Sequence, residues 1–149
     1  MNEANTVPSP AKILVVDDNP IIQRSVHFAL RDKGYQILMA GEVAEAIKIL
    51  RREKVDLALV DLSFPLDTAS IGSLQQDGFF FIEWLDRTPE VVKPPIIIIS
   101  SMEPAKYLDR AAAAGVKACL QKPLVKETLL AAVESALSGS GMADQPNLS

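Results

Sequence analysis

Short apolar runs alternate along this chain with segments whose apolar residues recur at helical spacing, and this alternation most restricts its fold. Strand candidates lie at residues 13–16, 35–40, 57–60, 96–99 and 117–120, and those at 13–16, 57–60 and 96–99 are continuous apolar runs. Continuous apolar runs of this length are typical of strands buried on both faces. Because helix-length segments separate them, the strands must run parallel, with right-handed crossovers that place helices on both faces. The sequence therefore predicts an α/β protein with a doubly wound, five-stranded parallel sheet.

The helical segments carry start and stop signals. Pro20 follows Asp18 and Asn19, either of which can cap a helix, and Gly34 ends that helix. Further helices are expected over residues 42–53, 78–87, 104–115 and 125–137. Residues 1–11 and 138–149 are polar and rich in Asn, Pro, Ser or Gly. We therefore expect one domain at 12–137 between two tails, the second tail being a free end or the start of a linker.

Composition excludes several classes of protein. One Cys and one His leave no internal disulfide and no plausible zinc cluster. A net charge of −4 argues against a chain whose main task is to bind nucleic acid or an anionic membrane. No apolar stretch approaches the roughly 20 residues of a membrane-spanning helix. The polar first ten residues resemble no signal peptide, so we expect a cytoplasmic protein.

The residues that end the strands are the candidate site, because doubly wound sheets bind ligands beyond the carboxyl ends of their strands. Each has an ordinary explanation when taken alone, as a helix cap, a turn former, a hydrogen-bonded hydroxyl or a solvated lysine. Together they are much more specific, because four separate strands end in compatible chemistry. The set consists of Asp17, Asp18, Asp61, Ser100 and Lys122.

This set of side chains suits phosphoryl transfer. Three clustered carboxylates repel one another unless a cation is present, and hard oxygen ligands favour Mg²⁺ or Mn²⁺. A carboxylate beside such an ion can attack phosphorus and form an acyl phosphate. The Lys122 ammonium and the Ser100 hydroxyl can stabilise the charge on the transferring oxygens.

The segment Ile-Leu-Val-Val-Asp-Asp-Asn-Pro at residues 13–20, together with Asp61, Ser100 and Lys122-Pro123, resembles the receiver domain of two-component response regulators of the chemotaxis-regulator type. The resemblance covers residues 12–137. It implies a flavodoxin-like sheet with strand order 2-1-3-4-5. It also implies a phosphorelay signalling protein that carries an aspartyl phosphate at Asp61.

The same resemblance implies the roles of the site residues. Asp18 and Asp61 would ligate Mg²⁺ directly, the backbone carbonyl of Ser63 would be a third ligand, and Asp17 would act through water. Ser100 would be the hydroxyl that moves toward the phosphoryl group. Lys122 would pair with the phosphoryl oxygens, and a cis peptide bond is expected before Pro123.

The partners follow from the resemblance as well. The phosphoryl group would come from the phospho-His of a sensor histidine kinase or a phosphotransfer protein. Output would be contact with an unknown downstream protein, with a phosphorylation-dependent homodimer as one option, and without direct contact to nucleic acid or membrane. The domain would catalyse its own phosphorylation and dephosphorylation without turning over a free substrate.

The sequence departs from the family at two places. The Asp77-Gly78 pair comes later after Asp61 than is usual, so extra residues lie at 66–76. They are either a tolerated surface insertion or a lid or partner-specific surface beside Asp61. Cys119 stands where the family usually has Tyr or Phe, so activation would use another route or the switch would be weak.

Three further interpretations stay open. The resemblance implies that Met102 and Ser63 occupy the positions that tune the water attacking the phosphoryl group, and neither has a charge or an amide to orient that water, which predicts a long-lived phosphoryl state. A pseudo-receiver, which binds proteins without phosphorylation, is the alternative function. A small phosphohydrolase of the haloacid dehalogenase class is disfavoured, because Ser63 stands where that class needs a second acid.

Overall fold

The sheet has five parallel strands in the order β2-β1-β3-β4-β5. The computed structural model describes residues 10–62 and 77–139. The strands are β1 (Lys12–Val16), β2 (Gln36–Ala40), β3 (Leu57–Asp61), β4 (Ile96–Ser100) and β5 (Ala118–Gln121). The predicted fold class and the flavodoxin-like strand order are confirmed.

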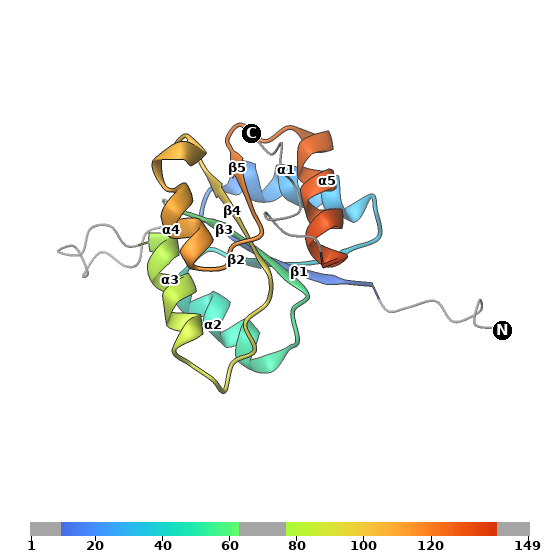
Figure 1. Cartoon of the computed structure of the whole chain (residues 1–149). Helices are drawn as coiled ribbons and strands as arrows, with labels where there is room; N and C mark the ends of the chain where they lie inside the picture. The colour runs from blue at the N-terminus through green and yellow to red at the C-terminus, as the bar shows by residue number, and fades with distance from the viewer. Residues whose placement is uncertain (1–9, 63–76, 140–149) are drawn as a thin grey trace.

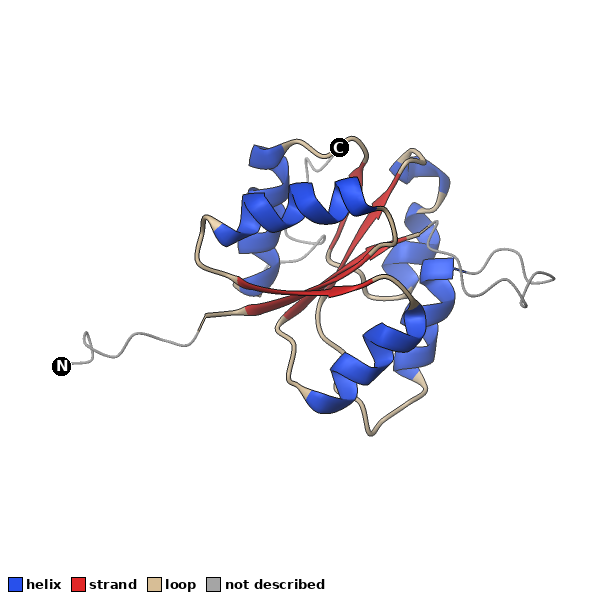
Figure 2. Ribbon diagram, turned by 180° about the vertical axis from the view of Figure 1, so that it is seen from behind, coloured by secondary structure: helices blue, strands red, loops and turns tan. Residues whose placement is uncertain are grey.

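Helices cover both faces of the sheet, as Figures 1 and 2 show. They are α1 (Pro20–Arg31), α2 (Val43–Arg52), α3 (Asp77–Asp86), α4 (Leu108–Ala113) and α5 (Lys126–Leu137), with a short 3₁₀ helix, η3 (Pro104–Lys106). Successive strand residues point to opposite faces, so each strand contributes to two cores. Leu14 and Val16 pack with α2, α3 and α4, whereas Ile13 and Val15 pack with α1 and α5.

Asn19 is the residue that caps α1. Its side-chain Oδ1 accepts hydrogen bonds from the backbone N–H groups of Ile21, at 2.8 Å, and Ile22, at 3.4 Å. Pro20 occupies the first helical position, where it has no N–H to leave unsatisfied. The helix is followed by Gly34 with φ of +88°, a backbone conformation that glycine adopts without strain. Both predicted boundary signals are therefore confirmed.

The expected single helix over residues 104–115 is wrong, because the chain forms η3 and then α4. Tyr107 lies between them with φ of −135° and ψ of 10°, outside the helical region. This backbone geometry buries the Tyr107 ring, which makes an edge-to-face contact with Phe79 at a centroid distance of 6.1 Å. Burial of a large aromatic ring outweighs the small gain from an uninterrupted helix.

Several predictions concern residues that lie outside the described ranges. These are the tails at 1–9 and 140–149, the extra residues at 66–76, and Ser63. The expected division into one domain and two tails therefore stays a prediction. Within the described ranges, every helix is too short or too polar to cross a membrane.

Candidate functional site

Three carboxylates meet at the carboxyl edge of the sheet. Asp17, Asp18 and Asp61 each offer one carboxylate oxygen, and these oxygens lie within 4.8 Å of one another. The register of the central strands explains this, because Val16 of β1 pairs with Val60 of β3 and the next residues are Asp17 and Asp61. Asp17 and Asp61 are buried, whereas Asp18 is exposed.

Lys122 lies between the two buried carboxylates. Its Nζ is 3.2 Å from Asp17 Oδ2 and 3.3 Å from Asp61 Oδ2, and its side chain is 15% exposed. The residue follows β5, and its backbone N–H donates to the carbonyl of Ser100 at 2.8 Å. The peptide bond between Lys122 and Pro123 is cis, as expected. One ammonium group thus neutralises part of the charge of two acids.

The electrostatics of Asp17 suit a cation. Burial raises the pKa of its carboxyl, and the charge of Asp61 raises it further. The backbone N–H of Asn19, which donates to Asp17 Oδ1 at 2.8 Å, and the charge of Lys122 oppose this shift without cancelling it. Among the described residues, the polar partner of the buried Asp17 Oδ2 is the Lys122 ammonium at 3.2 Å. Such an oxygen beside two further carboxylates fits a small, hard divalent cation.

Ser100 ends β4 beside the acids. The residue is 1% exposed, and its Oγ accepts a hydrogen bond from the Met102 N–H at 3.0 Å. That bond orients the hydroxyl at the edge of the sheet. The structure therefore brings Asp17, Asp18, Asp61, Ser100 and Lys122 together at one edge, while Ser63 lies outside the described residues.

Gln23 is a site residue that sequence reasoning missed. Its side-chain Nε2 donates to the backbone carbonyl of Asp17, which ties α1 to the turn that presents the carboxylates. A glutamine within a helix pattern resembles any solvated polar residue, so the sequence carries no signal for this contact.

Cys119 is half-buried on β5 and packs against the core that contains Tyr107. Burial raises the pKa of its thiol to about 11, so the thiol is protonated at neutral pH. The hydroxyl of Tyr107 is buried in the same region and interacts with the Cys119 thiol. Cys119, which stands where the family usually has Tyr or Phe, therefore lies beside an aromatic residue from another element, Tyr107.

The strand order is that of a flavodoxin-like domain with an acidic cluster at the carboxyl edge of its sheet, and the comparisons with known proteins identify its family. A model of the response regulator receiver domain matches residues 13–134. The chain belongs to the response regulator receiver domain family. Receiver domains bind Mg²⁺ in an acidic pocket and interact with sensor histidine kinases or phosphotransfer proteins, and the family assignment is consistent with phosphorylation-dependent signalling.

Curated relatives agree with this assignment. The chain is 31% identical over 136 residues to the transcriptional regulatory protein GlrR of Escherichia coli (strain K12), which covers 90% of this chain and 28% of GlrR. It is 28% identical over 129 residues to Protein PilH of Pseudomonas aeruginosa, covering 87% of this chain and 99% of PilH. This chain thus spans only a minor part of GlrR but nearly all of PilH.

Solved structures show the same fold. The chemotaxis response regulator CheY4 of Vibrio cholerae is similar with a TM-score of 0.72 and 26% identity, covering 85% of this chain and 98% of that one. A two-component response regulator from Clostridium difficile is similar with a TM-score of 0.72 and 25% identity, covering 87% and 97%.

Proposed function

We propose that this domain accepts a phosphoryl group from a phospho-His donor protein onto Asp61, with Mg²⁺ or Mn²⁺, and signals by contact with another protein. The observation that carries the proposal is the position of Lys122. Its ammonium lies within 3.3 Å of a carboxylate oxygen of both Asp17 and Asp61. A buried carboxylate with an adjacent cation and further acids is the arrangement that phosphoryl transfer to an acid needs.

The proposed phosphoryl transfer is a single displacement at the phosphorus atom. An oxygen of Asp61 forms a bond to the phosphorus atom, and the bond from phosphorus to the donor imidazole nitrogen breaks. The imidazole keeps the electron pair of that bond, and it leaves as a neutral group when its other ring nitrogen carries a proton. Lys122 Nζ then pairs with a phosphoryl oxygen, and the Ser100 hydroxyl donates a hydrogen bond to another.

The metal would be held by Asp18 and Asp61, with Asp17 acting through water and the Ser63 carbonyl as a further ligand. A bound Mg²⁺ supplies positive charge that neutralises the phosphoryl oxygens. The cluster of three carboxylates supports this assignment, because the single charge of Lys122 offsets only part of their negative charge and a divalent cation would offset the rest.

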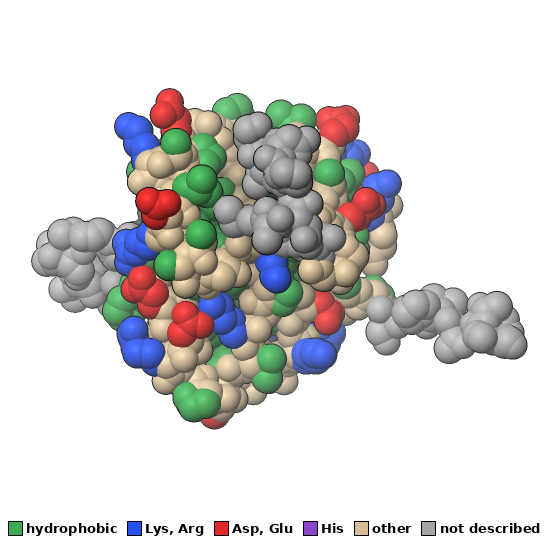
Figure 3. All heavy atoms as spheres, in the orientation of Figure 1, with side chains coloured by type: hydrophobic (Ala, Val, Ile, Leu, Met, Phe, Trp, Pro, Cys, Tyr) green, Lys and Arg blue, Asp and Glu red, His purple; other side chains and the backbone are tan. Residues whose placement is uncertain are grey.

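The surface supports a protein partner. Three exposed apolar side chains come from the loops or helix starts that follow β1, β4 and β5: Ile21, Met102 and Val125. In the view of Figure 3, acidic and basic side chains are interspersed, and no large area carries one sign of charge. We therefore infer that the phosphodonor and the output partner are proteins rather than nucleic acid or membrane. We also propose that the domain works in the cytoplasm.

Intact-mass measurement tests the proposal. The protein is incubated with Mg²⁺ and acetyl phosphate or phosphoramidate, with Asp61→Asn as the matched control. We expect one added phosphoryl group on the wild type and none on the variant. If no donor gives an adduct and Mg²⁺ does not bind, the domain is a pseudo-receiver instead. Decay of the adduct in Mg²⁺ also tests the long-lived phosphoryl state: rapid decay contradicts it.

A further inference from the structure

We propose that Gly78 is a positioning residue for the phosphoacceptor, because the absence of a side chain there fixes the backbone that carries Asp61. This inference rests on the proposed function. Gly78 is the second residue of α3, a full loop away from Asp61 in sequence, yet the two residues are in contact.

The space around Gly78 admits no side chain. A Cβ atom on this residue would lie 2.7 Å from the backbone carbonyl oxygen of Asp61 and 3.0 Å from the Cα of Leu62. It would also lie 3.2 Å from Leu62 Cδ2. The first two are backbone atoms, so they cannot turn away as the end of a flexible side chain could. The backbone N–H of Gly78 also donates to the Leu62 carbonyl at 3.3 Å, which keeps the two segments together.

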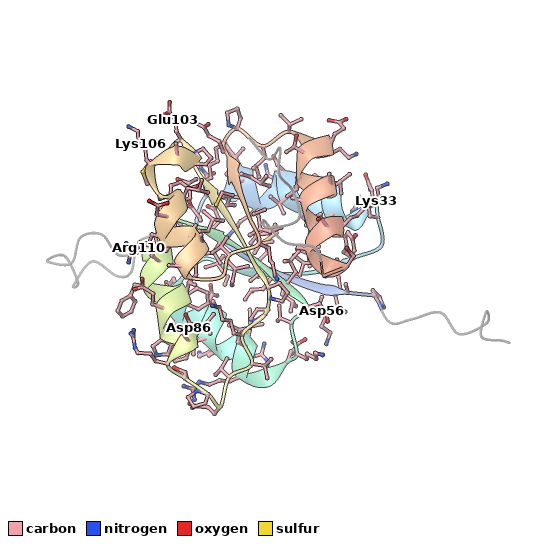
Figure 4. The ribbon with its side chains drawn as sticks, viewed as in Figure 1. Lys33, Asp56, Asp86, Glu103, Lys106 and Arg110 are labelled. Atoms are coloured by element: carbon pink, nitrogen blue, oxygen red, sulfur yellow. The ribbon has the colours of Figure 1, made fainter. Side chains whose placement is uncertain are left out.

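The helix itself cannot easily move away to make room. Phe81 and Ile82 of α3 are fully buried in the core. Phe79 packs edge to face on Tyr107, and the guanidinium of Arg110 lies 4.3 Å from the centroid of its ring. Arg110 is labelled on α4 in Figure 4. It also pairs with Glu83 of α3 at 3.0 Å, so it ties the two helices together.

A side chain at Gly78 would therefore displace the peptide group between Asp61 and Leu62. That group is bonded directly to the Asp61 Cα, so a displacement that shifts this Cα also moves the carboxylate relative to Lys122 and Asp17. Phosphoryl transfer requires reacting atoms in a narrow geometry, and a shift of about 1 Å can lower a rate by roughly 100-fold.

A second glycine offers a matched comparison. Gly41 follows β2 at the same edge of the sheet, but a Cβ there would lie 3.7 Å from Glu45 Oε1 and 3.9 Å from Gln23 Nε2. These are ordinary contacts with side-chain ends. Alanine should thus be tolerated at Gly41 and not at Gly78.

The test compares Gly78→Ala, Gly41→Ala and wild type in Mg²⁺ with acetyl phosphate. We measure the phosphorylation rate at saturating donor by intact mass, and the Mg²⁺ dissociation constant by calorimetry. Val133→Ala on α5 serves as a destabilised variant remote from the site, because Val133 is buried in the opposite core. We expect a rate at least about 10-fold lower and weaker Mg²⁺ binding for Gly78→Ala only.

Each other outcome has a definite meaning. If the wild type takes no phosphoryl group, the proposed function fails rather than this inference. If the wild type is phosphorylated and Gly78→Ala stays within about two-fold of it, the inference is overturned. It is also overturned if circular dichroism shows that Gly78→Ala does not fold, or if the phosphorylation rate of Val133→Ala falls as much as that of Gly78→Ala. In either case Gly78 contributes only to the stability of the fold.

Discussion

At Asp17, the negative charge that would attract a metal ion is also a charge that destabilises the folded state. Its carboxyl is buried, and its pKa is raised chiefly by that burial. Because the folded-state pKa lies above that of the unfolded chain, the ionised carboxyl costs stability at neutral pH. That cost disappears as the pH falls below about 4, where the unfolded chain is protonated too.

We therefore expect Asp17→Asn to raise the free energy of unfolding in metal-free buffer at pH 7, by on the order of 1 kcal/mol. In Mg²⁺ this advantage should shrink, because the amide cannot supply the charge that favours the cation. Urea unfolding with EDTA and with Mg²⁺ measures both quantities. A variant less stable than wild type in EDTA contradicts the electrostatic explanation.

Cys119 provides a second test at the residue scale, and its effect on stability is expected at alkaline pH. Its raised pKa of about 11 means that the folded state keeps the thiol proton after the unfolded chain has lost it. Stability should therefore fall as the pH rises from about 9 toward 11.

Cys119→Ser should weaken this alkaline loss of stability relative to wild type, as measured by thermal unfolding at several pH values. A thiol-specific reagent at pH 8 should react slowly with the folded wild type and rapidly in urea, since the thiolate is the reacting form. Fast reaction of the folded protein would show that the thiol is neither buried nor protonated.

At the scale of the element, α1 depends on a single cap. Asn19 satisfies two N–H groups of the first turn through its side chain. We expect Asn19→Ala to lower the free energy of unfolding by about 1 kcal/mol, whereas Asn19→Asp keeps a capping oxygen and most of the stability. Urea unfolding distinguishes them, and equal stability of Asn19→Ala and wild type would rule out this cap as a significant contribution.

The start of α3 and the break before α4 show that helices in this protein yield to tertiary contacts. Gly78 is a weak helix former that sits within α3, where close approach to Asp61 excludes a side chain. Tyr107 interrupts the segment at residues 104–115, which was expected to form one helix, because its ring is buried against Phe79. In both places packing outweighs local propensity.

At the scale of the whole molecule, we expect folding and metal binding to be coupled. The acidic cluster exists only when β1 and β3 are paired, so a cation that binds it must stabilise the folded state. We expect Mg²⁺ at about 100 times its dissociation constant to add about 2.7 kcal/mol to the free energy of unfolding. Thermal unfolding across a Mg²⁺ series measures this, with Asp61→Asn expected to respond weakly. An identical response of wild type and variant would place the ion elsewhere.

Much of the fold and of the candidate site was predictable from sequence. The apolar runs around Leu14, Leu59 and Ile98 mark buried strands because their pattern is local, and the polar residue that ends each strand follows directly. Parallel topology then requires those strand ends to share one edge. The helix break at Tyr107 was not predictable, since its cause is a contact with Phe79 on another element.

The sequence by itself thus determined the layered architecture and the chemical identity of the residues at the sheet edge. Only the tertiary structure decided how those residues meet: that Lys122 contacts two acids, that Gln23 holds the carbonyl of Asp17, and that Gly78 lies against the backbone of Asp61. The physical reason is one of range. Periodicity and capping act between neighbours in the chain, whereas these contacts join segments that come together only when the sheet and its helices pack.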